Sequence, residues 1–138
     1  MRPKSPTLTA NELELMKIVW AHPAGVTVRD VYEALRARRA IAYTTVMTSM
    51  KTLEQKGYLT ASQQDRAFVY MPSQPKHKVI KAMVREFVDR VFNGSSRPLV
   101  VHLLEDDQLS ERDLQEIAQM TGGIRGNVPS EKKAGKKR

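Results

Sequence analysis

The sequence predicts a mainly α-helical protein with one small β-hairpin and a second, entirely helical region after it. Apolar residues recur with the 3.6-residue period of an amphipathic helix in three segments that precede Gly57. The period changes to 2 over residues 58–71, as in a β-hairpin, and returns to 3.6 from Lys76 onwards. A proline-bounded linker at residues 72–75 separates the two regions. We therefore expect one domain at residues 8–72 and another at residues 73–121.

The charge of the chain is high and unevenly distributed. Its 138 residues include 23 Lys and Arg against 15 Asp and Glu, a net charge of +8 that suits a polyanionic partner such as nucleic acid. Residues 1–81 hold 13 basic and 6 acidic residues, whereas residues 99–120 hold 1 basic and 6 acidic. The length allows one ordinary domain, or a small domain with an appended helical part. The chain is therefore electrically polarised, with its acidic excess in the second region.

The first helix is predicted to begin at a capping box, because Thr9 precedes Glu12 by three residues. The residues expected on its buried face are Leu13, Met16 and Trp20. Ahead of this helix, residues 1–7 carry two prolines and two basic residues, so we expect a flexible arm there.

A second helix is expected to begin after Thr27, with Asp30 in its first turn. Three arginines gather at its far end: Arg36, Arg38 and Arg39. Cationic side chains in this place complement the helix dipole, and they could equally bind DNA phosphates. Both interpretations stay open, and Arg38 and Arg39 are the candidate phosphate contacts.

The third helix, predicted over residues 43–57, has two chemically different faces. One stripe carries hydroxyl groups at i, i+3, i+4 and i+7 and consists of Thr45, Thr48, Ser49 and Thr52. A second, apolar stripe is expected to face the core and consists of Val46, Met47, Met50 and Leu53. Ser and Thr are mediocre helix formers, but their short side chains can bond phosphate oxygens or base edges. The segment is therefore either a DNA recognition helix, from Tyr43 to Lys56, or an ordinary amphipathic helix with a small polar face.

Residues 58–62 and 67–71 are predicted to be the strands of the hairpin, with polar residues 63–66 at its tip. The alternation places Phe68 and Tyr70 on one face. Only residues 40–42 join the second and third helices, so the three helices and the hairpin together describe a winged helix-turn-helix. Arg66 would then lie at the tip of the wing, either in contact with the DNA backbone or minor groove or as a solvated turn charge.

The second region is predicted to be a three-helix dimerisation region. Residues 76–92 form a strongly apolar helix that needs another surface to cover it, and a second copy of the chain is the simplest provider. A short helix follows Ser95 or Ser96, and the last helix begins at a capping box of Ser110 and Asp113. The residues expected at the dimer interface are Ile80, Met83, Val84, Phe87, Val91, Leu99, Leu103, Leu104, Leu114 and Ile117.

The glycine pair at residues 122–123 is expected to end the last helix. Residues 122–138 would then be a disordered basic tail, which adds charge and solubility or weakly attracts DNA.

The sequence contains no recognisable catalytic or cofactor motif. Its three histidines are not spaced at i and i+4, and no HExxH, Walker, GxGxxG or GxSxG pattern occurs. The run Glu105-Asp106-Asp107 diverges along the backbone, so we expect no metal there. The chain has no cysteine, hence no disulfide and no thiolate site, and no apolar run is long enough for a membrane span or a secretory signal. We expect a cytoplasmic, nucleoid-associated protein that is not an enzyme, needs no cofactor and does not insert into a membrane.

The chain from Leu8 to Met120 resembles the penicillinase and methicillin-resistance repressors, the BlaI/MecI-type winged-helix family. The most specific string is AYTTVMTSMKTLEQKGYL at residues 42–59, supported by LTANELELMKIVW at 8–20, VTVRDVYEAL at 26–35 and RAFVYMP at 66–72. The resemblance implies a homodimeric repressor whose winged helices bind successive major grooves of a palindromic operator. The positions that match the family's DNA-binding motif are Tyr43, Thr44, Thr45, Thr48 and Arg66. The outward face of the helix adds Ser49, Lys51 and Thr52.

The means of induction is not indicated by the resemblance. In the best-known members, an antibiotic-sensing membrane metalloprotease signals cleavage at an Asn-Phe bond, and the dipeptide that resembles this position here is His102-Leu103. A copper-responsive branch uses cysteine pairs, which this chain lacks. Two other functions compete with a sequence-specific repressor: a non-specific, chromatin-like DNA-binding protein, and a protein-interaction module that binds no DNA.

Overall fold

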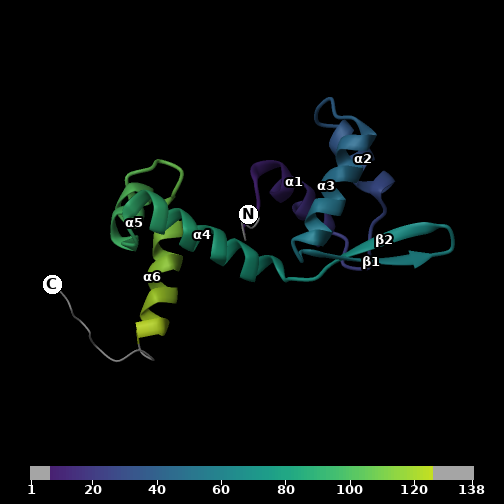
Figure 1. Cartoon of the computed structure of the whole chain (residues 1–138). Coiled ribbons are helices and arrows are strands. Elements are labelled where there is room, and N and C mark those ends of the chain that lie inside the picture. The colour runs from purple at the N-terminus through teal and green to yellow at the C-terminus, as the bar shows by residue number, and fades with distance from the viewer. Residues whose placement is uncertain (1–6, 126–138) are drawn as a thin grey trace. The chain divides into compact units, whose positions relative to one another are not determined.

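The computed structural model describes residues 7–125, and the side chains of residues 7–122 within that range. The elements shown in Figure 1 are α1 (Ala10–Trp20), α2 (Val28–Arg36), α3 (Tyr43–Gln55), β1 (Leu59–Gln64), β2 (Ala67–Pro72), α4 (Lys76–Phe92), α5 (Ser96–Leu104) and α6 (Glu111–Arg125). The expected fold class, mainly helical with one hairpin, is confirmed. Apart from Thr7, the flexible arm that the sequence predicts lies outside the described residues, as does most of the predicted disordered tail.

The chain divides into two compact units, Met1–Phe87 and Val88–Arg138. The division falls inside α4 and not at the proline linker, where the sequence led us to expect it. The reason is that α4 begins on the core of the first unit: Val79 is buried in that core, and Met83 packs against it. A linker rich in proline and polar residues marks a turn in the chain, but it does not decide where the next helix is covered.

Both helices at the start of the first unit have the expected caps. The hydroxyl of Thr9 accepts a hydrogen bond from the backbone N–H of Glu12 at 3.2 Å, and a Glu12 carboxylate oxygen accepts one from the N–H of Thr9 at 2.9 Å. Thr27 and Asp30 make the same reciprocal pair at 3.0 and 3.1 Å. Each capping box satisfies N–H groups that the first helical turn leaves without a partner, which fixes where the helix begins.

The core of the first unit differs from the expected one on α1. Leu13 and Trp20 only border the core, and the buried apolar residues of α1 are Leu15, Met16, Ile18 and Val19. This helix packs against α2, α3 and β2, so its buried surface is wider than one stripe. Trp20 lies at the edge, where its indole N–H donates to the carbonyl oxygen of Gln74 at 3.0 Å.

The end of α3 leads into the hairpin through a Schellman motif. The N–H of Tyr58 donates to the carbonyl of Leu53 at 2.9 Å, and that of Gly57, whose φ is +91°, donates to Glu54 at 3.0 Å. Strands β1 and β2 then pair antiparallel from Leu59↔Pro72 to Gln64↔Ala67. The turn needs only Asp65 and Arg66, and not the expected four residues, because Asp65 adopts a φ of +56°.

The second unit contains the end of α4 together with α5 and α6. Asn93 and Gly94, with φ values of +55° and +89°, stop α4. Ser110 and Asp113 form the expected capping box, with both hydrogen bonds at 3.0 Å. The expected end of α6 at the glycine pair is wrong, because the helix continues to Arg125. Glycine weakens a helix by about 1 kcal/mol relative to alanine but does not forbid helical dihedral angles.

Candidate nucleic-acid interface

The helix α3 has one fully buried side and one exposed side. Its buried residues are Val46, Met50 and Leu53, each 0% exposed. On the other side, Thr44, Thr45, Thr48 and Lys51 are exposed, while Ser49 and Thr52 are half-buried. Within residues 7–122, the hydroxyl groups of the three exposed threonines make no side-chain hydrogen bond. A row of hydroxyls without partners on an exposed helix can bond to a ligand surface.

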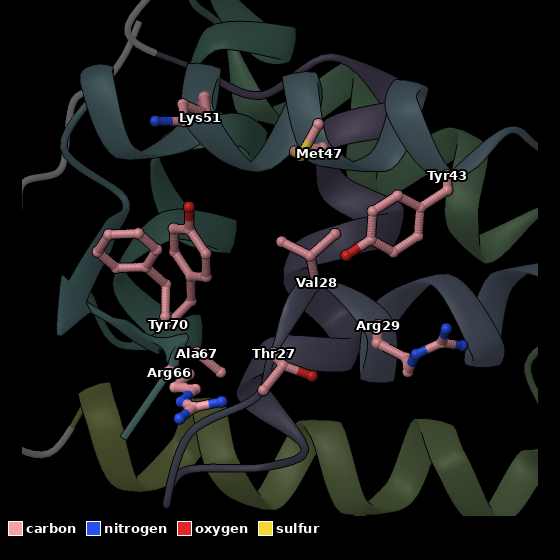
Figure 2. A pocket seen from close by; sticks show the side chains of 10 residues that line it. Thr27, Val28, Arg29, Tyr43, Met47, Lys51, Arg66, Ala67 and Tyr70 are labelled. Carbon is pink, nitrogen blue, oxygen red and sulfur yellow. The ribbon is translucent and has the colours of Figure 1, made fainter. Parts of the chain in front are cut away.

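Met47 does not belong to the buried side, contrary to the expectation from the sequence. It is 41% exposed and lies between Tyr43 and Lys51 on the flank of α3 that faces β2 (Figure 2). The neighbours of a helix set the width of its buried stripe, and α3 packs against α1, α2 and β1. One helical step of about 100° from Val46 is enough to carry Met47 out of that packing.

Tyr43 is fixed at the start of this flank by a contact with the preceding helix. Its ring meets the ring of Tyr32 edge-on, with the centroids 5.4 Å apart and an angle of 75° between the planes. This arrangement is favourable for aromatic pairs. Tyr43 is 40% exposed, so the remainder of its ring stays open on the same side as Met47.

An open hollow of about 590 Å³ lies between the start of α2, the Tyr43–Met47–Lys51 flank of α3 and the start of β2 (Figure 2). Three basic residues, Arg29, Lys51 and Arg66, line this hollow, and no acidic residue does. Arg29 pairs with Glu33 at 3.2 Å, whereas Lys51 and Arg66 have no ion-pair partner in the part of the chain that the structure describes. The hollow therefore has a positive potential suited to an anion.

The hollow keeps its shape because the start of α2 is joined to the hairpin. Val26 forms an isolated β-bridge with Tyr70 through hydrogen bonds of 2.9 and 2.7 Å. At Gly25, whose φ is +117°, a Cβ atom would lie 2.4 Å from Cγ1 of Val69. Only glycine permits this approach. The contact of Gly25 with β2 joins residues distant in sequence, so no local pattern in the sequence indicates it.

The arginines at the end of α2 have different surroundings. A guanidinium nitrogen of Arg39 lies 2.8 Å from a Glu14 carboxylate oxygen and 3.4 Å from the side-chain oxygen of Asn11, so Arg39 ties this end of α2 to α1. Arg36 pairs with Glu33 at 3.5 Å. Arg38 is exposed and makes no ion pair with any residue described by the structure. Arg38 is therefore the arginine of this group most open to a phosphate.

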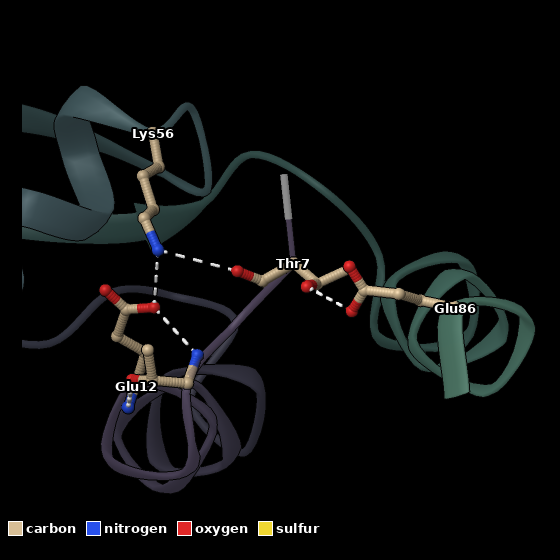
Figure 3. Close-up of polar contacts among 5 residues, drawn as sticks. Thr7, Glu12, Lys56 and Glu86 are labelled. Atoms are coloured by element: carbon tan, nitrogen blue, oxygen red, sulfur yellow. Dashed lines mark hydrogen bonds and ion pairs between the residues drawn. The ribbon is translucent and has the colours of Figure 1, made fainter. Parts of the chain in front are cut away.

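Lys56, at the end of the expected recognition helix, is buried and points away from the exposed face. Its ammonium lies 2.8 Å from the carboxylate of Glu12 and 3.5 Å from the carbonyl oxygen of Thr7 (Figure 3). The side chains of Lys56 and Glu12 are 8% and 10% exposed, respectively. Thr7 in turn donates a hydrogen bond of 2.6 Å to Glu86 on α4. Burial alone raises the pKa of Glu12, but the hydrogen bonds from Lys56 and Thr9 outweigh it, so this pKa lies below its ordinary value.

The residues expected at a dimer interface leave much apolar surface uncovered. Those that are exposed, by 39 to 53%, are Val84, Phe87, Val91, Leu103, Leu104 and Ile117. Those that are half-buried are Ile80, Met83, Leu99 and Leu114. Among residues 88–122, only Val88 is buried.

Over residues 7–125, no group of three or more His, Asp and Glu side chains is placed to hold a metal ion. None of the helices described there has the length and apolarity needed to cross a membrane.

Two tightly joined helices, the second with an outward row of hydroxyls, followed by a hairpin with a basic tip, define a winged helix-turn-helix DNA-binding protein. Residues 8–122 match the model of a family described as the penicillinase repressor, and the chain belongs to this family. Its members are DNA-binding transcriptional repressors and not enzymes. The resemblance seen in the sequence and the expectation of a non-enzyme are thus confirmed.

Known relatives match most of the chain. The penicillinase repressor of Bacillus licheniformis is 31% identical over 117 residues, which cover 85% of this chain and 91% of that protein. The transcriptional regulator BlaI of Mycobacterium tuberculosis is 34% identical over 121 residues, or 86% of this chain and 87% of that protein. A solution structure of the monomeric form of Bacillus licheniformis BlaI in complex with the blaP half-operator is 30% identical, with a TM-score of 0.46 over 53% of this chain and 88% of that one.

Proposed function

We propose that the protein is a homodimeric, sequence-specific repressor that binds a palindromic operator, with α3 of each copy in a major groove. The observation that carries this proposal is the exposed face of α3, where Thr44, Thr45 and Thr48 present hydroxyl groups that no other described side chain or carbonyl engages. Short hydroxyl side chains let a helix approach base edges closely, and threonine methyl groups can contact thymine methyl groups. The proposed compartment is the cytoplasm, where the operator DNA lies.

The proposed contacts fall into two chemical groups. Those on the recognition helix that contact bases or nearby phosphates are Tyr43, Thr44, Thr45, Thr48, Ser49 and Thr52. The basic residues that contact phosphates are Lys51, Arg66, Arg38 and Arg39. Arg39 can do so without losing Glu14, because only one of its guanidinium nitrogens is engaged and the group carries five N–H donors.

The proposed dimer forms through the helices α4, α5 and α6. Outside the first unit, the described residues form almost no core of their own, with Val88 alone buried, while Val91, Leu103, Leu104 and Ile117 are each more than 40% exposed. A helical unit this small cannot offset its conformational entropy with so little burial. A second copy supplies the missing apolar surface, and the two-fold symmetry of such a pair matches a palindromic site.

A DNA-binding titration tests this function. The full-length protein is titrated into a fluorescent duplex from the region upstream of its own gene and, at the same salt concentration, into a scrambled duplex of equal composition. We expect the first duplex to bind at least a thousandfold more tightly. Replacing both Thr45 and Thr48 with alanine should remove most of this preference. Thr121→Ala is the matched control, because it removes an exposed threonine hydroxyl on α6, away from the proposed DNA-binding face of α3.

Equal binding of the two duplexes would refute a sequence-specific repressor and favour the chromatin-like alternative, in which basic side chains bind any DNA through phosphates. Absence of binding to every duplex would favour the protein-interaction module. A role for a sensor protease has no support in the chain, because His102-Leu103 stands where the resemblance expects an Asn-Phe dipeptide. The family resemblance nevertheless keeps a membrane sensor protease system as a candidate partner.

A further inference from the structure

Met47 is an apolar side chain on a face of α3 that is otherwise dominated by hydroxyl and charged groups. It is 41% exposed, and Lys51 and Thr48 beside it are exposed as well. An exposed methionine contributes nothing to the core, where α3 is already covered through Val46, Met50 and Leu53. Because Met47 lies on the proposed recognition helix, we consider which group of the DNA it could contact.

The chemistry of the thioether limits what Met47 can recognise. Its sulfur is at most a weak acceptor and it has no donor, so it cannot make the bidentate hydrogen bonds by which Arg, Gln or Asn select a base. The C5-methyl of thymine is the apolar group that base pairs present in the major groove. A flexible, polarizable side chain such as methionine adapts well to an apolar group of this size.

The surroundings of Met47 favour a base over a phosphate as its contact. Met47 shares the hollow between α3 and β2 with Phe68, which is 54% exposed, and with Val28. These apolar side chains cannot bond a phosphate oxygen, whereas Lys51 and Arg66 in the same hollow can. Lys51 and Arg66 can therefore contact phosphates, whereas Met47 and its apolar neighbours are suited to an apolar group on a base.

We propose that Met47 is a specificity-determining residue that contacts the C5-methyl group of one thymine in each half of the operator. This inference rests on the proposed function, because it requires α3 to lie in the major groove. It adds a position at which sequence is selected by apolar contact, beside the hydroxyls of Thr44, Thr45 and Thr48.

The test removes single methyl groups from the DNA. A duplex is first selected from a randomised library by the full-length wild-type protein, and each thymine in it is then replaced in turn by deoxyuridine, which lacks only the C5-methyl. Binding of each duplex is measured for the wild-type protein and for Met47→Ala, Met47→Leu and Met47→Gln. Loss of one buried methyl contact should weaken wild-type binding about fourfold in each half-site.

We expect one symmetry-related thymine pair at which deoxyuridine weakens binding by the wild-type protein and by Met47→Leu, but not by Met47→Ala or Met47→Gln. The control Thr48→Ala should keep the methyl sensitivity at that pair. Two results would overturn the proposal: no thymine depends on its methyl group, or Met47→Ala keeps the dependence, as it would if it weakened the thymine and deoxyuridine duplexes by the same factor. If instead the library yields no preferred sequence, it is the proposed function itself that fails.

Discussion

Replacing Lys56 with methionine should destabilise the first unit while leaving DNA affinity almost unchanged. The ammonium of Lys56 lies 2.8 Å from the carboxylate of Glu12, and both side chains are at least 90% buried. Removing one partner of a buried ion pair typically costs about 3–5 kcal/mol, because the other charge is left without compensation. Methionine keeps most of the packing of the lysine stem, and Glu12 keeps its hydrogen bond from the N–H of Thr9. We therefore expect the free energy of unfolding to fall by about 3 kcal/mol, near the lower end of this range.

The stability lost in Lys56→Met should become smaller as the pH falls. In the wild-type protein the pKa of Glu12 lies below its ordinary value of 4.5, so this carboxylate stabilises the fold above about pH 4.5 and the contribution disappears as the pH falls through the folded-state pKa. In Lys56→Met, the hydrogen bond and charge that lower this pKa are gone and burial raises it, so protonation of Glu12 relieves the unpaired charge. The difference in unfolding free energy between the two proteins should therefore shrink from pH 7 towards pH 4.

Urea denaturation followed by circular dichroism measures this difference, and Lys51→Met is the matched control. Lys51 lies in α3, at whose C-terminal end Lys56 is the capping residue, but Lys51 is exposed and lacks an ion-pair partner among the described residues. Its replacement should change stability by less than about 0.5 kcal/mol. It should weaken DNA binding and reduce the slope of log K against log salt by about 0.9. A Lys51→Met protein as unstable as Lys56→Met would contradict a stabilising Lys56–Glu12 ion pair, as would a Lys56→Met destabilisation that does not change with pH.

Three further outcomes are expected. Gly25→Ala should lower stability by about 1–3 kcal/mol, because the new Cβ clashes with Cγ1 of Val69 and residue 25 has a φ of +117°. Adding Val69→Ala should recover part of this loss, which a double-mutant cycle by thermal denaturation would measure. Arg66→Ala should weaken operator and scrambled duplexes by the same factor and lower the salt slope by about 1, and a change in preference between them would contradict a phosphate contact. Leu104→Glu should convert the proposed dimer into a monomer in sedimentation equilibrium, because the Leu104 side chain is 53% exposed on α5. Gln108→Glu, which adds the same charge outside a helix, should not. A wild-type monomer at tens of micromolar would contradict the proposed dimer.

Local features of the sequence were sufficient to locate most elements. The capping boxes at Thr9, Thr27 and Ser110 begin three helices where the spacing of their partners predicts, and Asn93-Gly94 stops α4. These motifs act through hydrogen bonds and dihedral preferences within a few residues, so the sequence carries them completely. The same holds for the period change after Gly57, which marks the hairpin.

The sequence by itself also determined the family and the hydroxyl stripe of α3, because a repeat along one helix is set by the helical period alone. Only the tertiary structure decided which side chains of that helix are covered. Met47 was expected in the buried apolar stripe of α3 but is exposed. Lys56 was expected on the recognition helix, and its side chain is buried against Glu12. Both outcomes depend on how closely α1 and β1 approach α3. Contacts of this kind join residues far apart in the chain, and no local pattern records them.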